Sequence, residues 1–121
     1  MATATGHTQA IRAKKVIGAS VCDADGKKIG KVEDVVLDKL SNTIMFAIIG
    51  FGGVAGLGEK FHPVPWSILD YDESEDSYLI DLTQDQLKAA PADTMDMLTR
   101  DDGRAFRDLS YDYYGAERYW L

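Results

Sequence analysis

The segment Phe61-His62-Pro63-Val64-Pro65-Trp66 constrains the fold of this chain more than any other. Its two prolines exclude a helix and push the residues before them toward an extended backbone. We therefore predict extended chain from Phe61 to Leu69. The segment follows a stretch rich in glycine, which predicts a flexible loop over Gly52, Gly53, Gly56 and Gly58.

Short apolar runs separated by turn residues predict further strands. The first runs from Val16 to Cys22 and the second from Lys28 to about Asp38. Between them, Asp23-Ala24-Asp25-Gly26 has the composition of a turn, with Gly26 where a positive φ is needed. Lys39 to Asn42 makes the next turn.

The apolar residues change phase within the second predicted strand. Ile29 is in step with Val35, whereas Val32 is in step with Val36. A slip of this kind predicts a β-bulge near Glu33–Asp34, which would bend the strand around a barrel.

Two more strands are predicted from the apolar pattern. Ile44 to Gly50 is apolar at nearly every position, which predicts a strand buried on both faces or lying at the centre of a barrel. An acidic turn, Asp70 to Asp76, leads to a strand predicted over Tyr78 to Leu82. The short strands and turns together favour a mainly antiparallel barrel of five or six strands.

Two helices are predicted after the last strand. Thr83, followed three residues later by Gln86, has the capping-box pattern, and Pro91 marks where this short helix must have ended. Further on, Phe106, Leu109 and Tyr113 recur on one helical face, and Gly115 is placed to cap that helix.

The chain therefore divides into a flexible tail (1–11), a barrel domain (12–91) and a C-terminal helical tail (92–121). Half of the aromatic residues lie at or after Phe106. Disordered tails are poor in aromatic residues, so we expect residues 92–121 to dock on the barrel or on a second subunit. Sequence alone leaves both open.

Charge and cysteine content exclude several classes of protein. The net charge is −7, and more than half of the 20 acidic residues lie between Asp70 and Asp102. Such a surface repels phosphate backbones, so direct nucleic-acid binding is not expected; the basic patch of Arg12, Lys14 and Lys15 is too small for a footprint. One cysteine, Cys22, forms no intrachain disulfide and suits a reducing compartment as a small buried residue.

No apolar run is long enough for a signal peptide or for a membrane span, since the longest covers Ile44 to Phe51. We therefore expect a cytoplasmic protein without membrane insertion.

The glycine motifs do not support nucleotide binding. Gly50-Phe51-Gly52-Gly53-Val54-Ala55 matches a dinucleotide pattern in letters, but glycines and prolines follow where a helix is required. Gly53 to Gly58 has the gap of a phosphate-binding loop, but Glu59 stands where lysine is needed. We expect a connecting loop.

The remaining candidate sites also favour structural roles. Asp23 to Gly26 resembles the opening of a calcium loop, but Lys28 stands in place of the required glycine. The acidic residues from Asp70 to Asp76 are more typical of a solvated loop than of a cation site. His62 has no partner motif for catalysis or metal binding. Trp66 is expected in the core. We predict no catalytic, cofactor-binding or metal residues and no cofactor.

The order and spacing of these segments resemble those of the PRC-barrel family. Its small barrel occurs in the photosynthetic reaction-centre H subunit and in ribosome-maturation factors. The resemblance covers about Arg12 to Pro91. The residues that carry it are Gly26, Gly30, Val32, Asp34 and Leu37, then Phe46-Ala47-Ile48-Ile49-Gly50, Val64-Pro65-Trp66, and Tyr78 to Leu82.

The C-terminal residues, with Tyr113-Tyr114-Gly115 and Tyr119-Trp120, are similar to the ends of stand-alone bacterial members. The H subunit has a membrane helix and the maturation factors have a further domain, neither of which this sequence shows, so neither specific role is carried over.

The resemblance implies a barrel that works by binding, often to proteins, without catalytic residues. We expect a protein-binding or scaffolding module that self-associates as a homodimer through Tyr111, Tyr113, Tyr119 and Trp120. Two alternatives are a ribosome- or RNA-processing-associated assembly factor that acts through a protein partner, and a photosynthetic or membrane-complex-associated factor.

Overall fold

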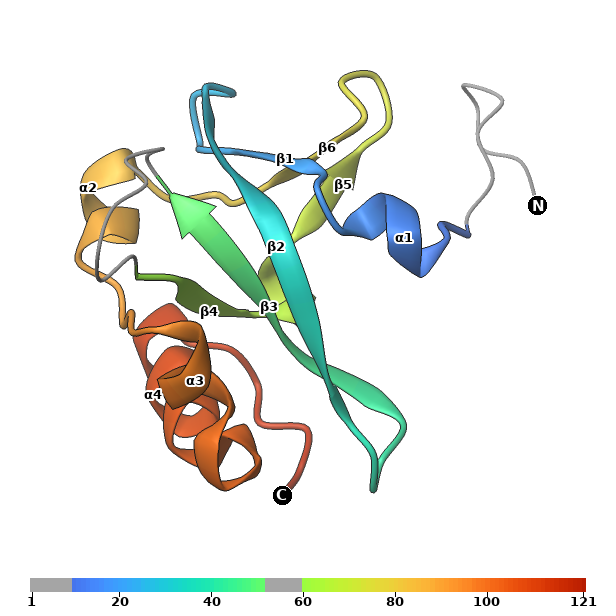
Figure 1. Ribbon diagram of the computed structural model, residues 1–121. Coiled ribbons are helices and arrows are strands. Elements are labelled where there is room, and N and C mark those ends of the chain that lie inside the picture. Colours follow the sequence, from blue (N-terminus) through green and yellow to red (C-terminus); the bar gives the residue numbers. More distant parts are fainter. Residues whose placement is uncertain (1–9, 52–59) are drawn as a thin grey trace.

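The computed structural model describes residues 10–51 and 60–121. Its strands form one six-stranded sheet in the order β4-β3-β2-β1-β6-β5 (Figure 1). The strands are β1 (Ser20–Cys22), β2 (Lys28–Asp38), β3 (Thr43–Phe51), β4 (His62–Pro65), β5 (Asp70–Asp72) and β6 (Ser77–Leu79). The helices are α1 (Ala13–Val16), α2 (Gln84–Lys88), α3 (Met95–Thr99) and α4 (Arg104–Tyr114), with 3₁₀ turns η1 (Trp66–Ile68) and η2 (Arg100–Gly103).

The mainly β class, the short helix and the C-terminal helix are confirmed. Neighbouring strands pair antiparallel with one exception, because β1 and β6 run parallel. The sheet is therefore mixed rather than purely antiparallel. Within residues 10–51 and 60–121, no strand pair joins β4 to β5, so these two strands form the edges of the sheet.

The β2–β3 hairpin contains the two longest strands of the sheet, and its predicted bulge is confirmed. β2 has its predicted bounds, and β3 is one residue longer at each end than predicted. The register shifts between Val32 and Asp34, which places the extra residue at Glu33. A second shift, between Val36 and Leu37, leaves Met45 on β3 without a registered partner on β2. Each bulge increases the twist of the hairpin, which crosses the molecule diagonally (Figure 1).

β3 is buried on both faces, as predicted. On one face Ala47 and Ile49 pack in a core with residues of β1, β2 and β6. On the other face Phe46 and Ile48 pack in a second core that includes Leu98 of α3. The alternation of side chains along a strand distributes them between these two cores.

Three predicted strand boundaries are wrong. The first strand begins at Ser20 rather than Val16, since the preceding residues form α1 and Gly18 turns the chain with φ +91°. The extended chain from Phe61 ends at Pro65, where η1 begins. The predicted acidic turn contains β5, and β6 covers Ser77–Leu79 rather than 78–82.

The turn and cap predictions are confirmed. Gly26 has φ +79°, and the Asp23 carboxylate accepts hydrogen bonds from the backbone N–H groups of Asp25 and Lys27. Thr83 and Gln86 form the capping box at the start of α2. Gly115 caps α4 with φ +66°.

The apolar positions that the sequence places on one face of α4 are not the ones that the helix buries. Leu109 and Tyr113 are 52% and 41% exposed, whereas Ser110 and Tyr111 are buried. Among the three predicted residues, Phe106 packs on the second core. The buried side of α4 is set by its packing against β4 and by the hydrogen bond from Tyr111 to the Met45 carbonyl of β3.

Candidate binding grooves

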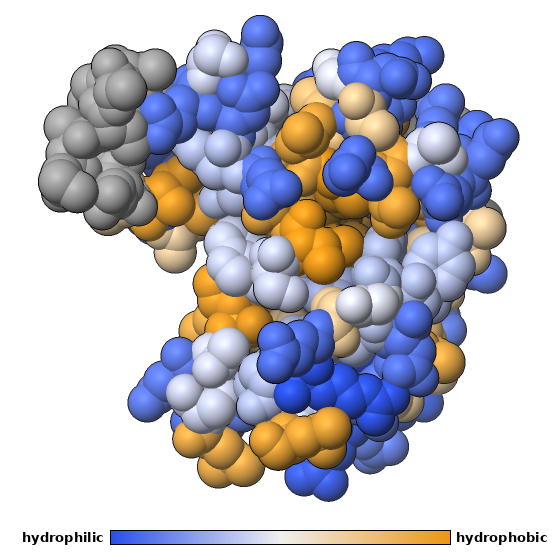
Figure 2. Space-filling model, turned by 180° about the vertical axis from the view of Figure 1, so that it is seen from behind, coloured by the Kyte–Doolittle hydropathy of each residue, from blue (hydrophilic) through white to orange (hydrophobic). Residues whose placement is uncertain are grey.

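Two open grooves lie on opposite parts of the sheet. The N-terminal groove, of about 1130 Å³, runs between residues 10–20, which include α1, and residues 66–78, which include η1, β5 and β6. The C-terminal groove, of about 880 Å³, runs between the β2–β3 turn and the C-terminal residues after η2. Figure 2 shows that the outline of the molecule is indented below α1.

Aromatic rings form the floor of the N-terminal groove. Trp66 and Tyr78 have ring centroids 5.5 Å apart, and Tyr71 and Tyr78 have centroids 5.3 Å apart. Tyr78 is buried, whereas Tyr71 is 38% exposed. Trp66 is half-buried against the first core rather than fully in it, so the sequence prediction for this residue is only partly correct. The rings offer a rigid apolar surface that reaches solvent.

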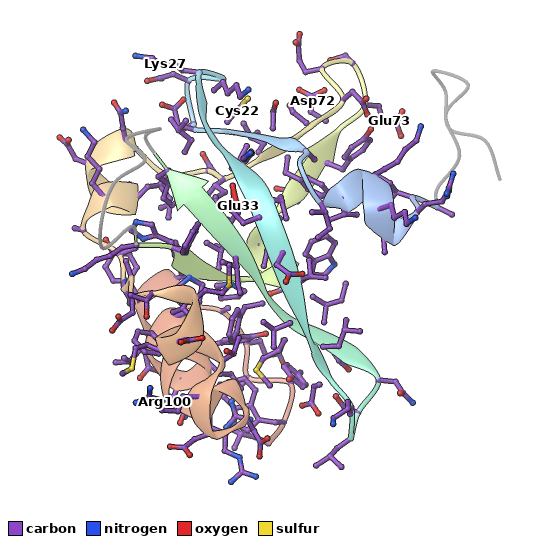
Figure 3. All side chains as sticks on the ribbon, in the orientation of Figure 1. Cys22, Lys27, Glu33, Asp72, Glu73 and Arg100 are labelled. Carbon is purple, nitrogen blue, oxygen red and sulfur yellow. The ribbon has the colours of Figure 1, made fainter. Side chains whose placement is uncertain are left out.

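Charges of opposite sign line the two walls of this groove. Arg12 and Lys15 lie on the α1 side, and Glu73 and Asp76 lie on the β5–β6 turn. Figure 3 shows Glu73 on the turn beside α1. The Tyr71 hydroxyl donates a hydrogen bond to Asp76, and this contact, chiefly, raises the pKa of Tyr71 to about 12. The groove therefore has a basic wall, an acidic wall and an aromatic floor.

Apolar side chains are exposed beside these charges. Ile11 is 41% exposed and Ile17 is 39% exposed. The connection from α1 to the sheet is nevertheless ordered, since Gly18 donates to the Val32 carbonyl at 2.7 Å and Val32 donates to the Ala19 carbonyl at 2.9 Å. Ile17 therefore directly precedes a connection that hydrogen bonds hold to β2.

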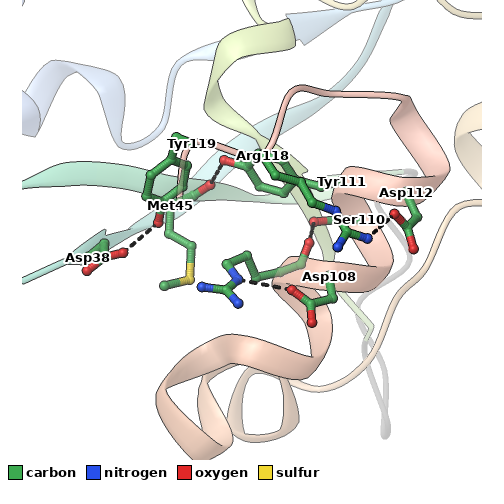
Figure 4. A network of polar contacts seen from close by, with 9 residues as sticks. Asp38, Met45, Asp108, Ser110, Tyr111, Asp112, Arg118 and Tyr119 are labelled. Carbon is green, nitrogen blue, oxygen red and sulfur yellow. Dashed lines mark hydrogen bonds and ion pairs between the residues drawn. The ribbon is translucent and has the colours of Figure 1, made fainter. Parts of the chain in front are cut away.

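The aromatic side chains at the C-terminal groove make hydrogen bonds and ring contacts within the chain (Figure 4). The buried Tyr111 hydroxyl donates to the Met45 carbonyl at 2.7 Å, which is the residue that the second bulge leaves without a registered partner on β2. Tyr119 donates to the Asp38 carboxylate at 2.8 Å. This hydrogen bond holds the pKa of Asp38 below its usual value.

Trp120 completes this packing. The Arg107 guanidinium lies 3.8 Å from the Trp120 ring centroid and also pairs with Asp108 at 3.1 Å. The Trp120 ring meets those of Tyr111 and Tyr119 edge-on, with centroids 4.8 and 5.1 Å apart. The rings that the sequence assigns to a dimer contact are therefore largely engaged within this chain.

His62 lies on β4, buried, with its ring 4.7 Å from the Phe51 ring. Its Nδ1 has no hydrogen-bond partner. Burial lowers the pKa of His62, against an opposing hydrogen bond to the Pro91 backbone. Burial thus favours the neutral form of the ring and keeps it away from solvent, an arrangement suited to packing.

The other candidate residues hold local structure. Cys22 is half-buried rather than fully buried, 3.8 Å from the Ser77 hydroxyl. Asp72 accepts hydrogen bonds from Ser74 and from the Glu75 backbone, which close the acidic turn. Within the described part of the chain, no cluster of histidine, cysteine or acidic residues could hold a metal ion. Most of the glycine motif, from Gly52 to Gly58, lies outside the described residues, as does most of the predicted 1–11 tail.

Sequence reasoning did not find the N-terminal groove. From sequence, Arg12, Lys14 and Lys15 form only a small basic patch. The acidic turn is predicted to be a solvated loop and Trp66 a core residue, with no link between them. One signal was available, because the apolar residues Ile11 and Ile17 flank the basic segment. The pairing of residues 10–20 with residues 66–78 depends on the parallel β1–β6 ladder.

Among the described residues, the structure contains no helix with the length and apolar character that a bilayer span requires. The family model for the PRC-barrel domain matches residues 9–87. A search of curated proteins gives no significant match to this chain.

Proposed function

The chain belongs to the PRC-barrel family, and we propose that it is a non-catalytic protein-binding module whose docking surface is the N-terminal groove. The observation that carries this proposal is the groove's composition. Exposed Ile11, Ile17 and Tyr71 lie beside opposite charges over an aromatic floor. Protein interfaces combine an apolar, aromatic centre with a polar rim in this way.

The chemistry of the described side chains supports a binding role rather than catalysis. His62, the one histidine in the family-matched strands, is buried and has an Nδ1 without a hydrogen-bond partner. General acid–base catalysis needs a group within hydrogen-bond reach of a substrate proton. We propose that the protein acts by holding another polypeptide.

A polypeptide partner is favoured over nucleic acid by charge. The chain carries a net charge of −7, and nucleic-acid affinity depends on basic contacts to phosphates. A role in ribosome assembly or in a membrane complex would use the same protein-docking step. We place this step in the cytoplasm, in keeping with the single cysteine.

A comparison of two surface variants tests this function. Ile17→Asp puts a charge in the N-terminal groove, and Leu40→Asp puts one on the 94%-exposed β2–β3 turn. Tagged wild type, Ile17→Asp and Leu40→Asp proteins are used to capture proteins from lysate, with and without nuclease. We expect Ile17→Asp alone to lose the wild-type partners, with no effect of nuclease. Retention by Ile17→Asp, or loss on nuclease treatment, would contradict the proposal.

A further inference from the structure

We propose that the partner in the N-terminal groove is a second copy of this chain, related to the first by a two-fold axis. This inference rests on the proposed function and names the partner for the same groove. It assigns the contact to the α1 side of one copy and the β5–β6 turn of the other. The same contact then occurs twice, as a two-fold interface requires.

The charges on the groove walls support a self-complementary contact. Arg12 and Lys15 line one wall, while Glu73 and Asp76 line the other. A partner that matches both walls must itself carry an acidic and a basic region side by side. A copy of this surface, rotated by 180°, places its acidic turn on the basic wall and its basic segment on the acidic turn. Electrostatic complementarity of this kind fixes register and disfavours other partners.

The basic wall has the opposite sign to the net charge of the chain. Arg12, Lys14 and Lys15 are all exposed on or next to α1, in a chain whose net charge is −7. Two copies of such a chain repel one another on most of their surfaces. An orientation that brings α1 to an acidic turn replaces this repulsion by attraction, so charge selects the groove over other faces.

The apolar side chains of the groove supply binding free energy that the charges alone do not. Ile11, Ile17 and Tyr71 are three of the large apolar side chains that remain more than one-third exposed, and all three line this groove. Surface ion pairs contribute little free energy, whereas burial of these side chains contributes roughly 25 cal/mol per Å². The apolar contact therefore provides affinity and the charges provide orientation.

The edge strand β5 does not itself form the two-fold contact. Asp70 and Asp72 lie on this three-residue strand. Pairing two β5 strands about a two-fold axis would bring like charges together, which is unfavourable. The contact between α1 and the β5–β6 turn avoids this repulsion. It also differs from the contact expected from sequence, whose rings Tyr111 and Trp120 pack within the chain.

Complementary charge reversals test the contact. Variant A is Arg12→Glu with Lys15→Glu, and variant B is Glu73→Lys with Glu75→Lys; Asp72 and Asp76 are kept because they bond within the turn. In A both regions are acidic, and in B the turn, which keeps Asp70, Asp72 and Asp76, loses most of its negative charge. Copies of A should repel one another and copies of B should lose the attraction, whereas a mixture of A and B regains one wild-type contact, between the basic segment of B and the acidic turn of A. The matched control, Lys39→Glu with Arg100→Glu, changes net charge as A does but at exposed positions outside the groove.

Sedimentation velocity over a concentration series provides the readout. We expect a wild-type dimer, a dissociation constant raised about tenfold or more in A and in B, an unchanged control, and a heterodimer in the equimolar mixture. Circular dichroism confirms that each variant is folded.

Two outcomes overturn the inference. One is a wild-type protein that stays monomeric at its highest soluble concentration. The other is a wild-type dimer with no A–B heterodimer from folded A and B. In either case the capture experiment with Ile17→Asp still decides the proposed function, because a loss of captured proteins in that variant would show that the groove binds a different polypeptide.

Discussion

The N-terminal and C-terminal grooves are alike in their parts but differ in how those parts are used. Each has aromatic rings, basic side chains and acidic side chains. At the C-terminal groove Tyr119 and Trp120, with the buried Tyr111 behind them, bond to or pack on the same chain. In the N-terminal groove the Tyr71 ring remains more than one-third exposed beside Ile17, whereas the exposed apolar residues of the C-terminal groove are the non-aromatic Leu37 and Leu40. The difference separates a region built for stability from one available for association.

The hydrogen bonds explain why the C-terminal groove is structural. A bulge in β3 leaves Met45 out of the β2–β3 register, and a buried carbonyl without a partner costs free energy. Tyr111, 66 residues further along the chain, supplies that partner. The C-terminal rings therefore complete the sheet.

The largest expected difference in stability is between the alanine variants of two tyrosines, one at each groove. Tyr111 is 3% exposed and Tyr71 is 38% exposed. We expect Tyr111→Ala to lower the free energy of unfolding by about 4 kcal/mol, as for a buried aromatic side chain, and Tyr71→Ala to lower it by about 1 kcal/mol. Urea denaturation measures both, and equal losses would erase the distinction between the two regions.

The sheet that separates the grooves is most sensitive at Gly30. A Cβ there would lie 2.0 Å from the Gly50 carbonyl oxygen of the paired strand. We expect Gly30→Ala to lower the free energy of unfolding by about 3 kcal/mol through this backbone clash. The change should disturb the packing around both grooves. Gly50→Ala is the matched control, because its nearest contact is the flexible Glu33 side chain at 3.4 Å. Thermal unfolding should show a change of less than about 1 kcal/mol for the control; similar losses in both variants would contradict the close approach at Gly30.

Two tryptophans allow the two grooves to be compared at equal burial, because both side chains are half-buried. Trp66 lines the N-terminal groove, and Trp120 lines the C-terminal one. We expect Trp66→Ala and Trp120→Ala each to cost about 2 kcal/mol, less than a fully buried aromatic residue would. Only Trp66→Ala should weaken association in sedimentation experiments. Weaker association in Trp120→Ala alone would assign the contact to the other groove.

The smallest expected effect is a difference in pH dependence. Burial, followed by the hydrogen bond to Asp38, raises the pKa of Tyr119 above 10. Because the unfolded chain loses this proton first, the stabilisation is complete below about pH 10 and is lost as the pH rises further. We expect Tyr119→Phe to remove part of this alkaline loss and to cost about 1 kcal/mol at neutral pH. Unfolding curves between pH 8 and pH 11, roughly spanning the tyrosine range, give the measurement. An unchanged alkaline slope in Tyr119→Phe would contradict the assignment.

Features set by neighbouring residues could be predicted from the sequence. The bulge near Glu33 followed from a phase slip over a few residues, and the α2 cap followed from Thr83 and Gln86. These signals are local, because a strand's register and a helix cap depend on adjacent side chains.

Features set by tertiary contact could not be predicted in the same way. The hydrophobic positions of α4 suggested a face with Leu109 and Tyr113, but the buried residues include Ser110. Ser110 is buried because its hydroxyl donates to the Arg107 carbonyl and its small size permits close packing. The N-terminal groove joins residues 10–20 to residues 66–78, and no local pattern records that long-range contact.

Amide chemical shifts over a dilution series test most directly whether the N-terminal groove is the interaction surface. We expect the shifts of Ile17, Gly18, Tyr71 and Glu73 to change with protein concentration, while those of Leu40, Asp102 and Tyr119 stay constant. Concentration-dependent shifts confined to the C-terminal groove, or no concentration dependence anywhere, would contradict the assignment of association to the N-terminal groove.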